Sequence, residues 1–181
     1  MVFLAGGITG CPDWQAEARA LLDDTELVVC NPRHPVFDVT DPNAARDQIE
    51  WEVEHIREAD MMLFWFPASG GVTQPIVLFE LGMALGRGRE LAVGTDLDYC
   101  RRYDVVQQCR HADLSQIVWT RLDQVCLQVR RRNATAILRG RCSFPSMKSP
   151  SRDGLASTAV SPCTDEQGGR CRVSSKVPHF R

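Results

Sequence analysis

The sequence lacks long apolar segments and regularly spaced metal ligands. No apolar run in the 181 residues approaches the ~20 residues that cross a bilayer, and the short opening segment lacks the basic residues of a signal peptide. The eight cysteines contain no C-x-x-C pair, and the four histidines are not spaced as zinc ligands beside them. We therefore expect reduced cysteines in a cytoplasmic protein without a metal site. A disulfide framework is the less favoured alternative.

Charge is divided unevenly between two parts of the chain. Residues 1–133 contain 13 Lys and Arg against 20 Asp and Glu, a net charge of −7, whereas residues 134–181 carry +5. Binding to a phosphate backbone requires a basic surface, so the acidic part argues against nucleic acid as the main partner. The basic part is rich in Ser, Pro and Gly and has no apolar period. We expect a folded domain at 1–133 and a disordered low-complexity tail at 134–181.

Short apolar segments alternate with helical patterns along the acidic part. Strands are expected at 2–5, 27–30, 61–66, 91–94 and 117–119, and helices at 14–22, 42–58, 75–88, 104–110 and 121–132. Asp41 is expected to cap the second helix. The segment MMLFWF at 61–66 does not alternate, which is typical of a strand buried on both faces. The pattern predicts an α/β fold, with an open parallel sheet of about five strands flanked by helices.

A single acid, Glu80, interrupts the apolar helical segment PIVLFELGMALGRG at 75–88. A carboxylate among such side chains carries a desolvation cost unless it is paired or takes part in chemistry. Pro75 is typical of a first helical turn, which places Glu80 in the second. Ligands of open parallel sheets bind where strands end and helices begin. We expect Glu80 to be a site residue; a carboxylate stabilised by the helix dipole is the alternative.

Two loops are candidates for ligand contact. Gly6 and Gly7 directly follow the first strand, where missing side chains let a ligand approach the backbone, although the full G-x-G-x-x-G pattern is absent. The loop PASGGVTQ at 67–74 is rich in hydroxyl groups and leads into the Glu80 helix, where a sugar or phosphate is able to bind. A simple turn and a simple connector are the alternative interpretations.

The second helix offers a partner acid for Glu80. Gln48, Glu52 and His55 form a polar stripe on it, which a solvated helix face also explains. Two glutamates at one cavity form a known chemical unit, in which one attacks an anomeric carbon and the other transfers a proton. Asp60 is a further acid at the start of the third strand, where closing the preceding turn is its favoured role.

Several segments, in order, resemble the nucleoside 2-deoxyribosyltransferase-like family, which includes nucleotide N-glycosidases. They are F-L-A-G-G-I at 3–8, Q-x-x-W-E at 48–52, A-D-M-M-L-F-W-F-P at 59–67 and E-L-G-M-A-L-G at 80–86. The segment G-T-D-L-D-Y-C-R-R-Y-D-V at 94–105 is similar to a less well characterised branch of the family. The resemblance covers roughly residues 2–126 and implies a flavodoxin-like, Rossmann-like sheet. It also implies retaining transfer of a deoxyribosyl group, a homo-oligomer, and neither cofactor nor metal.

The resemblance also implies roles for individual residues. Glu80 corresponds to the nucleophile, and Glu52 to the acid/base carboxylate, commonly aspartate in relatives. Phe3 stands where relatives often have a tyrosine that orients the nucleophile, and Gln74 where they have an acid or serine that contacts base or phosphate. The candidate substrate-binding residues are Phe3, Gly6, Gly7, Gln48, Asp60 and Gln74.

Two functions remain open from the sequence. The favoured one is cleavage or transfer at the N-glycosidic bond of a (deoxy)nucleoside or nucleotide, through a glutamyl-glycosyl intermediate. The alternative is a catalytically weak nucleotide-sensing module of the same fold. Phe3 favours the sensor because it lacks the hydroxyl that would donate to the glutamate, whereas the presence of both Glu80 and Glu52 favours the enzyme.

Overall fold

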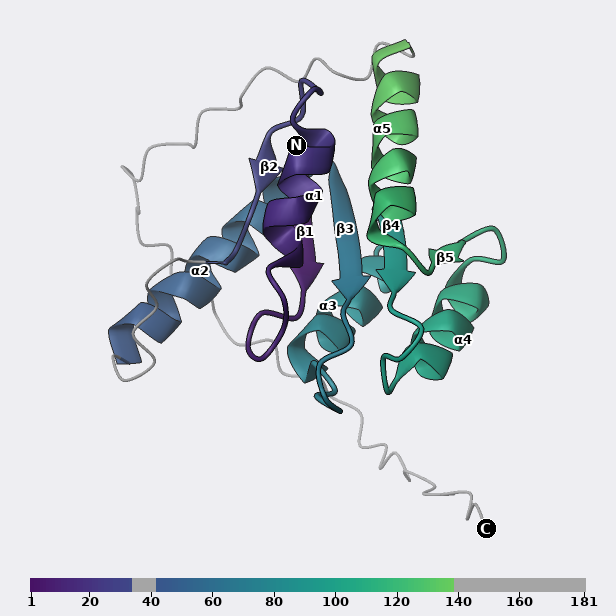
Figure 1. Ribbon diagram of the computed structural model, residues 1–181. Coiled ribbons are helices and arrows are strands. Elements are labelled where there is room, and N and C mark those ends of the chain that lie inside the picture. Colours follow the sequence, from purple (N-terminus) through teal and green to yellow (C-terminus); the bar gives the residue numbers. More distant parts are fainter. Residues whose placement is uncertain (34–41, 139–181) are drawn as a thin grey trace, which may run out of the picture. The chain divides into compact units, whose positions relative to one another are not determined.

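The computed structural model of the chain describes residues 1–33 and 42–138, which lie within one compact unit, Met1–Phe144 (Figure 1). The strands of the described residues are β1 (Val2–Gly6), β2 (Val29–Cys30), β3 (Met61–Phe66), β4 (Glu90–Thr95) and β5 (Val118–Trp119). Their helices are α1 (Trp14–Leu22), α2 (Pro42–Glu58), α3 (Pro75–Gly86), α4 (Arg102–Ala112) and α5 (Leu122–Leu138). Strands and helices therefore alternate, as the sequence predicts.

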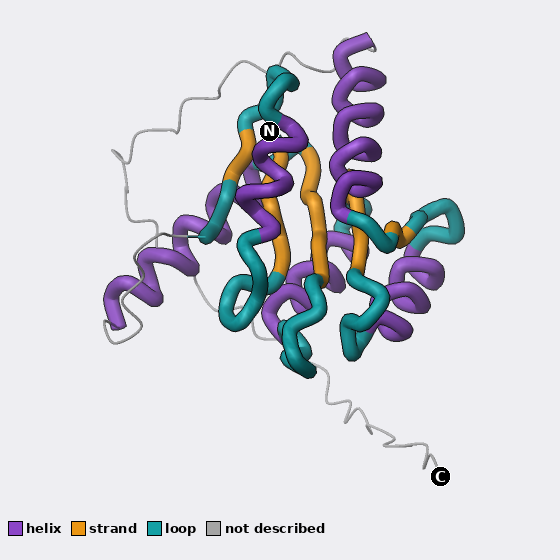
Figure 2. The backbone as a smooth tube through the Cα atoms, viewed as in Figure 1, coloured by secondary structure: helices purple, strands orange, loops and turns teal. Residues whose placement is uncertain are grey.

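All strand pairs in the sheet are parallel, and the strand order is β2-β1-β3-β4-β5 (Figure 2). This order is that of flavodoxin-like doubly wound sheets, in which the chain reverses its direction of winding beside β1. The structure thus confirms the predicted α/β fold with five parallel strands. The carboxyl ends of the strands meet at one edge of the sheet, where the loops that precede α1, α3 and α4 begin.

Helices cover both faces of the sheet. The helices α1 and α5 pack on one face, and α2, α3 and α4 pack on the other (Figure 1). Side chains of β3 alternate between the two cores: Phe64 and Phe66 face α3 and α4, whereas Leu63 and Trp65 face α1 and α5. Both faces of this strand are therefore buried, which explains why its sequence is apolar without alternation.

The ends of two helices, α5 and α3, can be compared with the sequence-based expectations. The last helix, α5, reaches Leu138 instead of residue 132, and so includes the first residues of the predicted tail. Buried Val129 and an ion pair from Arg130 to Asp24, with Nη2–Oδ2 at 2.7 Å, hold the middle of this helix to the domain. The helix α3 ends at Gly86, the first of the two glycines at its predicted exit, and Gly88 has a left-handed backbone with φ of 62°.

Some expectations concern residues outside the described ranges. These are the N-cap at Asp41 and the low-complexity tail from residue 139 onward. Within the described ranges, each of the five cysteines is a free thiol. No helix of residues 1–33 and 42–138 is both long and apolar enough to cross a membrane.

Candidate active site

Glu80 lies in the second turn of α3, partly buried on the face of the sheet that α2 and α4 also cover. The inner side of α3 packs on the core through Val77, Leu81 and Ala84. Burial and, to a smaller extent, the charge of Glu52 together raise the pKa of Glu80 to about 7. The two glutamates that the sequence singles out therefore lie close enough for the charge of one to act on the other, on two helices of the same sheet face.

A hydrogen-bond chain fixes the carboxylate of Glu52. Gln48, one turn earlier on α2, donates from Nε2 to Glu52 Oε1 at 2.8 Å. The same nitrogen donates to the carbonyl oxygen of Pro32 at 2.9 Å, just after β2. Gln48 thus ties the Glu52 side chain to the end of a strand. An (i, i+4) pair on a solvated face would lack this second anchor.

Aromatic rings lie between α2 and the sheet. The ring of Phe3, which is 1% exposed, lies 6.3 Å from that of Trp51, measured between centroids. Trp51 in turn stacks on His55 at 4.0 Å, and His55 Nδ1 lies 2.8 Å from the carbonyl oxygen of Trp51. This layer is apolar and, at Phe3, offers no hydroxyl donor to a carboxylate.

Gly6 and Gly7 allow close packing at the end of β1. A Cβ atom on Gly6 would lie 2.3 Å from the carbonyl oxygen of Trp65 and 2.4 Å from the ring of Trp14. A Cβ atom on Gly7 would lie 2.7 Å from the side-chain amide of Gln74. The space beside both glycines is filled by the protein itself. Their contacts support a packing role more than the open approach for a ligand that the sequence suggests.

Gln74 closes the loop that leads into α3. It caps the helix with a left-handed backbone, φ 49°, and is only 5% exposed. Its Nε2 donates to the carbonyl oxygen of Pro67 at 2.9 Å and lies 3.5 Å from Ser69 Oγ. Its Oε1 is buried and has no hydrogen-bond partner among the described residues. Gln74 therefore spans the loop from end to start and keeps one acceptor unused.

Asp60 lies apart from the other candidate residues. It is exposed at the amino end of β3, where it forms an ion pair with the N-terminal ammonium of Met1. Because all strands run parallel, this end lies at the opposite edge of the sheet from the start of α3. The structure thus groups Glu80, Glu52, Gln48 and Phe3 on one face and leaves Asp60 at a distant edge. The sequence shows that Asp60 is next to the apolar strand β3, but it does not show at which edge of the sheet Asp60 lies.

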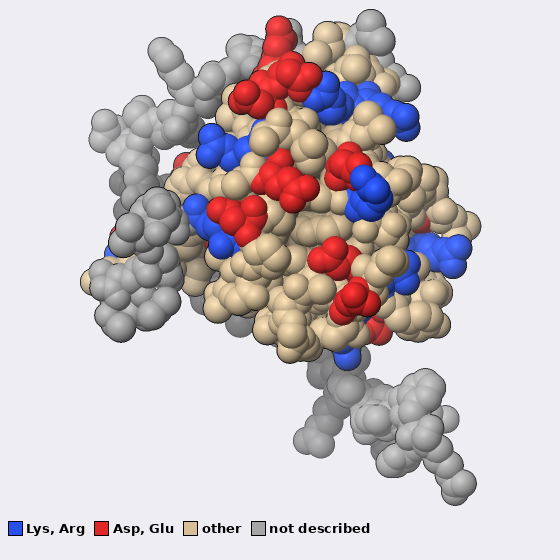
Figure 3. All heavy atoms as spheres, viewed as in Figure 1, with Lys and Arg blue, Asp and Glu red and all other residues tan. Residues whose placement is uncertain are grey.

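A cavity of about 430 Å³ opens on the opposite face of the sheet. Its walls come from the first turns of α1 and α5 and from the ends of β3 and β4, and Glu80 and Glu52 are not among them. Figure 3 shows this face, on which acidic and basic side chains are interspersed over α1 and α5. Two of the acids at the cavity have partners within the protein: Asp13 caps α1 and pairs with Arg33, and Asp123 pairs with Arg121.

Fold and site define a class: a doubly wound parallel sheet with two neighbouring glutamates on helices of one face. A comparison with known families names the family within this class. The model of the family described as nucleoside 2-deoxyribosyltransferase like matches residues 1–99, more than half of the chain, and the chain belongs to this family. None of the curated proteins compared with the chain matches it. The matched range contains Glu52, the loop 67–74 and Glu80.

Proposed function

We propose that the protein cleaves or transfers the N-glycosidic bond of a (deoxy)nucleoside or nucleotide through a glycosyl ester on Glu80. Family membership supports a role in nucleoside glycosyl transfer. The single observation that carries the finer proposal is the electrostatic coupling of Glu80 to Glu52 in a poorly solvated region. Paired carboxyl groups of this kind are the working groups of retaining glycosyl transfer.

The proposed reaction has two steps. In the first, a carboxylate oxygen of Glu80 bonds to the anomeric carbon while the bond from that carbon to the base nitrogen breaks, and protonated Glu52 gives its proton to the departing base. In the second, the Glu52 carboxylate removes a proton from water or from a second base, which attacks the anomeric carbon and releases Glu80. Water and a second base are alternative acceptors of one intermediate, so hydrolysis and transfer share all earlier steps.

Surrounding residues support these roles. The hydrogen bond from Gln48 orients the Glu52 carboxylate, and orientation of a catalytic group before substrate arrives lowers the barrier that follows. The rings of Phe3 and Trp51 keep water from one side of the region. A low local polarity strengthens the interaction between a carboxylate and the positive charge that develops on the sugar.

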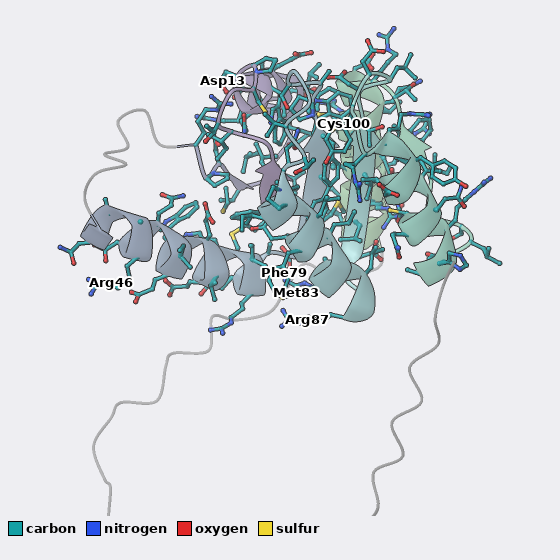
Figure 4. All side chains as sticks on the ribbon, turned by 90° about the horizontal axis from the view of Figure 1, so that it is seen from below. Asp13, Arg46, Phe79, Met83, Arg87 and Cys100 are labelled. Atoms are coloured by element: carbon teal, nitrogen blue, oxygen red, sulfur yellow. The ribbon has the colours of Figure 1, made fainter. Side chains whose placement is uncertain are left out.

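We also propose that the protein is a homo-oligomer in which the outer side of α3 is covered. On α3, Ile76 and Phe79 are 66% and 65% exposed, although the helix is apolar on all sides. Figure 4 shows Phe79 and Met83 on the side of α3 that points away from the sheet. A helix that is apolar on all sides is typically buried.

We further propose that the protein is cytoplasmic, because its free thiols suit a reducing compartment.

The function is tested by incubating the protein with deoxynucleosides and their 5′-monophosphates, with and without a second free base. Released or exchanged base is then measured. We expect turnover by the unaltered protein and by Glu54→Gln, a control at an exposed position of α2, but none by Glu80→Gln. Binding without turnover would instead support the nucleotide-sensing module, which the missing hydroxyl at Phe3 also favours.

A further inference from the structure

We propose that Tyr99 is a positioning residue that holds the loop 67–74 and, through it, the first turns of the helix that carries Glu80. This inference rests on the function proposed above and deepens it. Tyr99 belongs to the segment 94–105, which the sequence marks as similar to relatives but to which it assigns no role. The segment connects β4 to α4, next to the loop that connects β3 to α3.

Two hydrogen bonds join these neighbouring connections near the two ends of the loop. At its start, the backbone N–H of Ala68 donates to Asp96 Oδ2 at 2.6 Å. At its end, the hydroxyl of Tyr99 donates to the carbonyl oxygen of Thr73 at 2.7 Å. A loop held at both ends by one rigid segment has few other conformations available.

A third contact lies in the middle of the loop. The thiol of Cys100 lies 3.5 Å from the carbonyl oxygen of Gly71 and 3.7 Å from that of Val72, and donates weakly to both. Figure 4 shows Cys100 at the edge of the sheet where the strands end. Contacts to the start, middle and end of the loop therefore come from a single short stretch of chain after β4.

The loop needs such support because of its backbone. Gly70, Gly71 and Gln74 all have positive φ angles, 58°, 93° and 49°. For Gln74, a residue with a Cβ atom, this conformation is unfavourable and persists only where surrounding contacts fix it. The carbonyl group that Tyr99 holds belongs to Thr73 and lies in the peptide bond to Gln74. The hydrogen bond thus fixes the peptide plane from which α3 starts.

Tyr99 is itself firmly anchored. Its ring is part of a residue only 3% exposed and lies 5.1 Å from the ring of Phe66, measured between centroids. Burial raises the pKa of Tyr99 to about 12, so the hydroxyl remains a donor over the whole range in which Glu80 titrates. Tyr99 therefore links the loop to the sheet core, and it stays uncharged while Glu80 titrates.

The chain offers a matched pair of variants for the test. Tyr99→Phe removes the hydroxyl but keeps the ring on Phe66, and Tyr103→Phe removes the hydroxyl of the other tyrosine, which is 74% exposed on α4. Amide hydrogen exchange of residues 69–78 measures the loop without any substrate. Loss of one hydrogen bond, about 1 kcal/mol, should speed this exchange roughly fivefold in Tyr99→Phe and leave it unchanged in Tyr103→Phe. Equal exchange in both variants would overturn the proposal.

The consequence for Glu80 is measured separately. A looser loop admits water, so the pKa of Glu80, observed by carbon NMR of the labelled carboxyl group, should fall toward its ordinary value in Tyr99→Phe and stay near 7 in Tyr103→Phe. With a cleaved substrate, kcat should fall more than KM rises. Faster exchange with an unshifted Glu80 pKa would also overturn the positioning role. Absence of turnover in the unaltered protein would refute the proposed function alone, because exchange and titration would still test Tyr99.

Discussion

Burial of Glu80 on α3, and after it the charge of Glu52 on α2, raises the pKa of Glu80 to about 7. Two acids in one poorly solvated region are expected to separate their titrations, so that one remains protonated near neutral pH. In the free protein the raised pKa belongs to Glu80, the residue proposed as nucleophile. Only its deprotonated form has the negative charge that attacks an anomeric carbon, and about half of the molecules have an ionised Glu80 at pH 7.

The first prediction concerns the pH dependence of the reaction. For a deoxynucleoside with a good leaving group, which departs without a proton, we expect kcat/KM to rise about tenfold per pH unit below 7 and to level off above it, because only deprotonation of Glu80 in the free protein is then required. The measurement is kcat/KM for a deoxynucleoside between pH 5 and 9. A rate that falls as pH rises through 7 would mean that Glu80 acts as the acid instead.

The second prediction concerns the coupling itself. Glu52→Gln removes the charge that helps to raise the pKa of Glu80, so the rising limb of the pH profile should move to lower pH. Burial remains, so we expect the limb to stay above the ordinary glutamate range. Glu54→Gln, two residues away and exposed, is the control and should leave the limb in place. If the rising limb does not move in Glu52→Gln, the charge of Glu52 does not affect the pKa of Glu80.

The third prediction concerns proton transfer to the leaving base. Glu52→Gln should slow cleavage of substrates with poor leaving groups by ~10²–10⁴-fold, the usual contribution of general acid catalysis. Substrates with good leaving groups depart without a proton and should lose much less. Equal losses for both kinds of substrate would assign Glu52 a binding role, and an unaffected rate would remove it from the mechanism.

The fourth prediction concerns stability. The pKa of Glu80 in the folded protein, about 7, lies above the ordinary glutamate value of 4.5, so between these values the folded state binds more protons than the unfolded state. Glu80 therefore lowers stability as pH rises from 4.5 to 7. Glu80→Gln should unfold at a higher denaturant concentration than the parent at pH 8, with a free energy of unfolding larger by on the order of 3 kcal/mol at most. Near pH 4 the two proteins should be equally stable. Identical curves at pH 8 would show that Glu80 is well solvated.

Most of the fold was predictable because it depends on local patterns. The strand MMLFWF is apolar at each position because both sheet faces are covered, and the helix 14–22 has the same ends in sequence and structure. The ion pair that holds α5 to the domain was not predictable, since the partner of Arg130 is Asp24, far away in the chain. Contacts of this kind leave no periodic signal in the sequence.

The candidate acids could be selected from the sequence, whereas the contacts that hold them could not. Glu80 stands out because a charge in an apolar helix is unusual, and the family resemblance assigns Glu52 as its partner. The bond from Gln48 to the carbonyl group of Pro32 and the bond from Tyr99 to that of Thr73 end on backbone atoms. Any residue supplies a backbone carbonyl, so no residue type in the sequence marks these partners.

The central claim is that Glu80 forms the bond to the sugar, and covalent trapping tests it most directly. A 2-fluoro-substituted nucleoside slows release of the sugar from the protein, so that the adduct accumulates and its peptide can be identified by mass spectrometry. We predict one fluorosugar per chain on the peptide that contains Glu80, and no adduct in Glu80→Gln, whose fold is unchanged by circular dichroism. An adduct on Glu52, or one that persists in Glu80→Gln, would contradict the account.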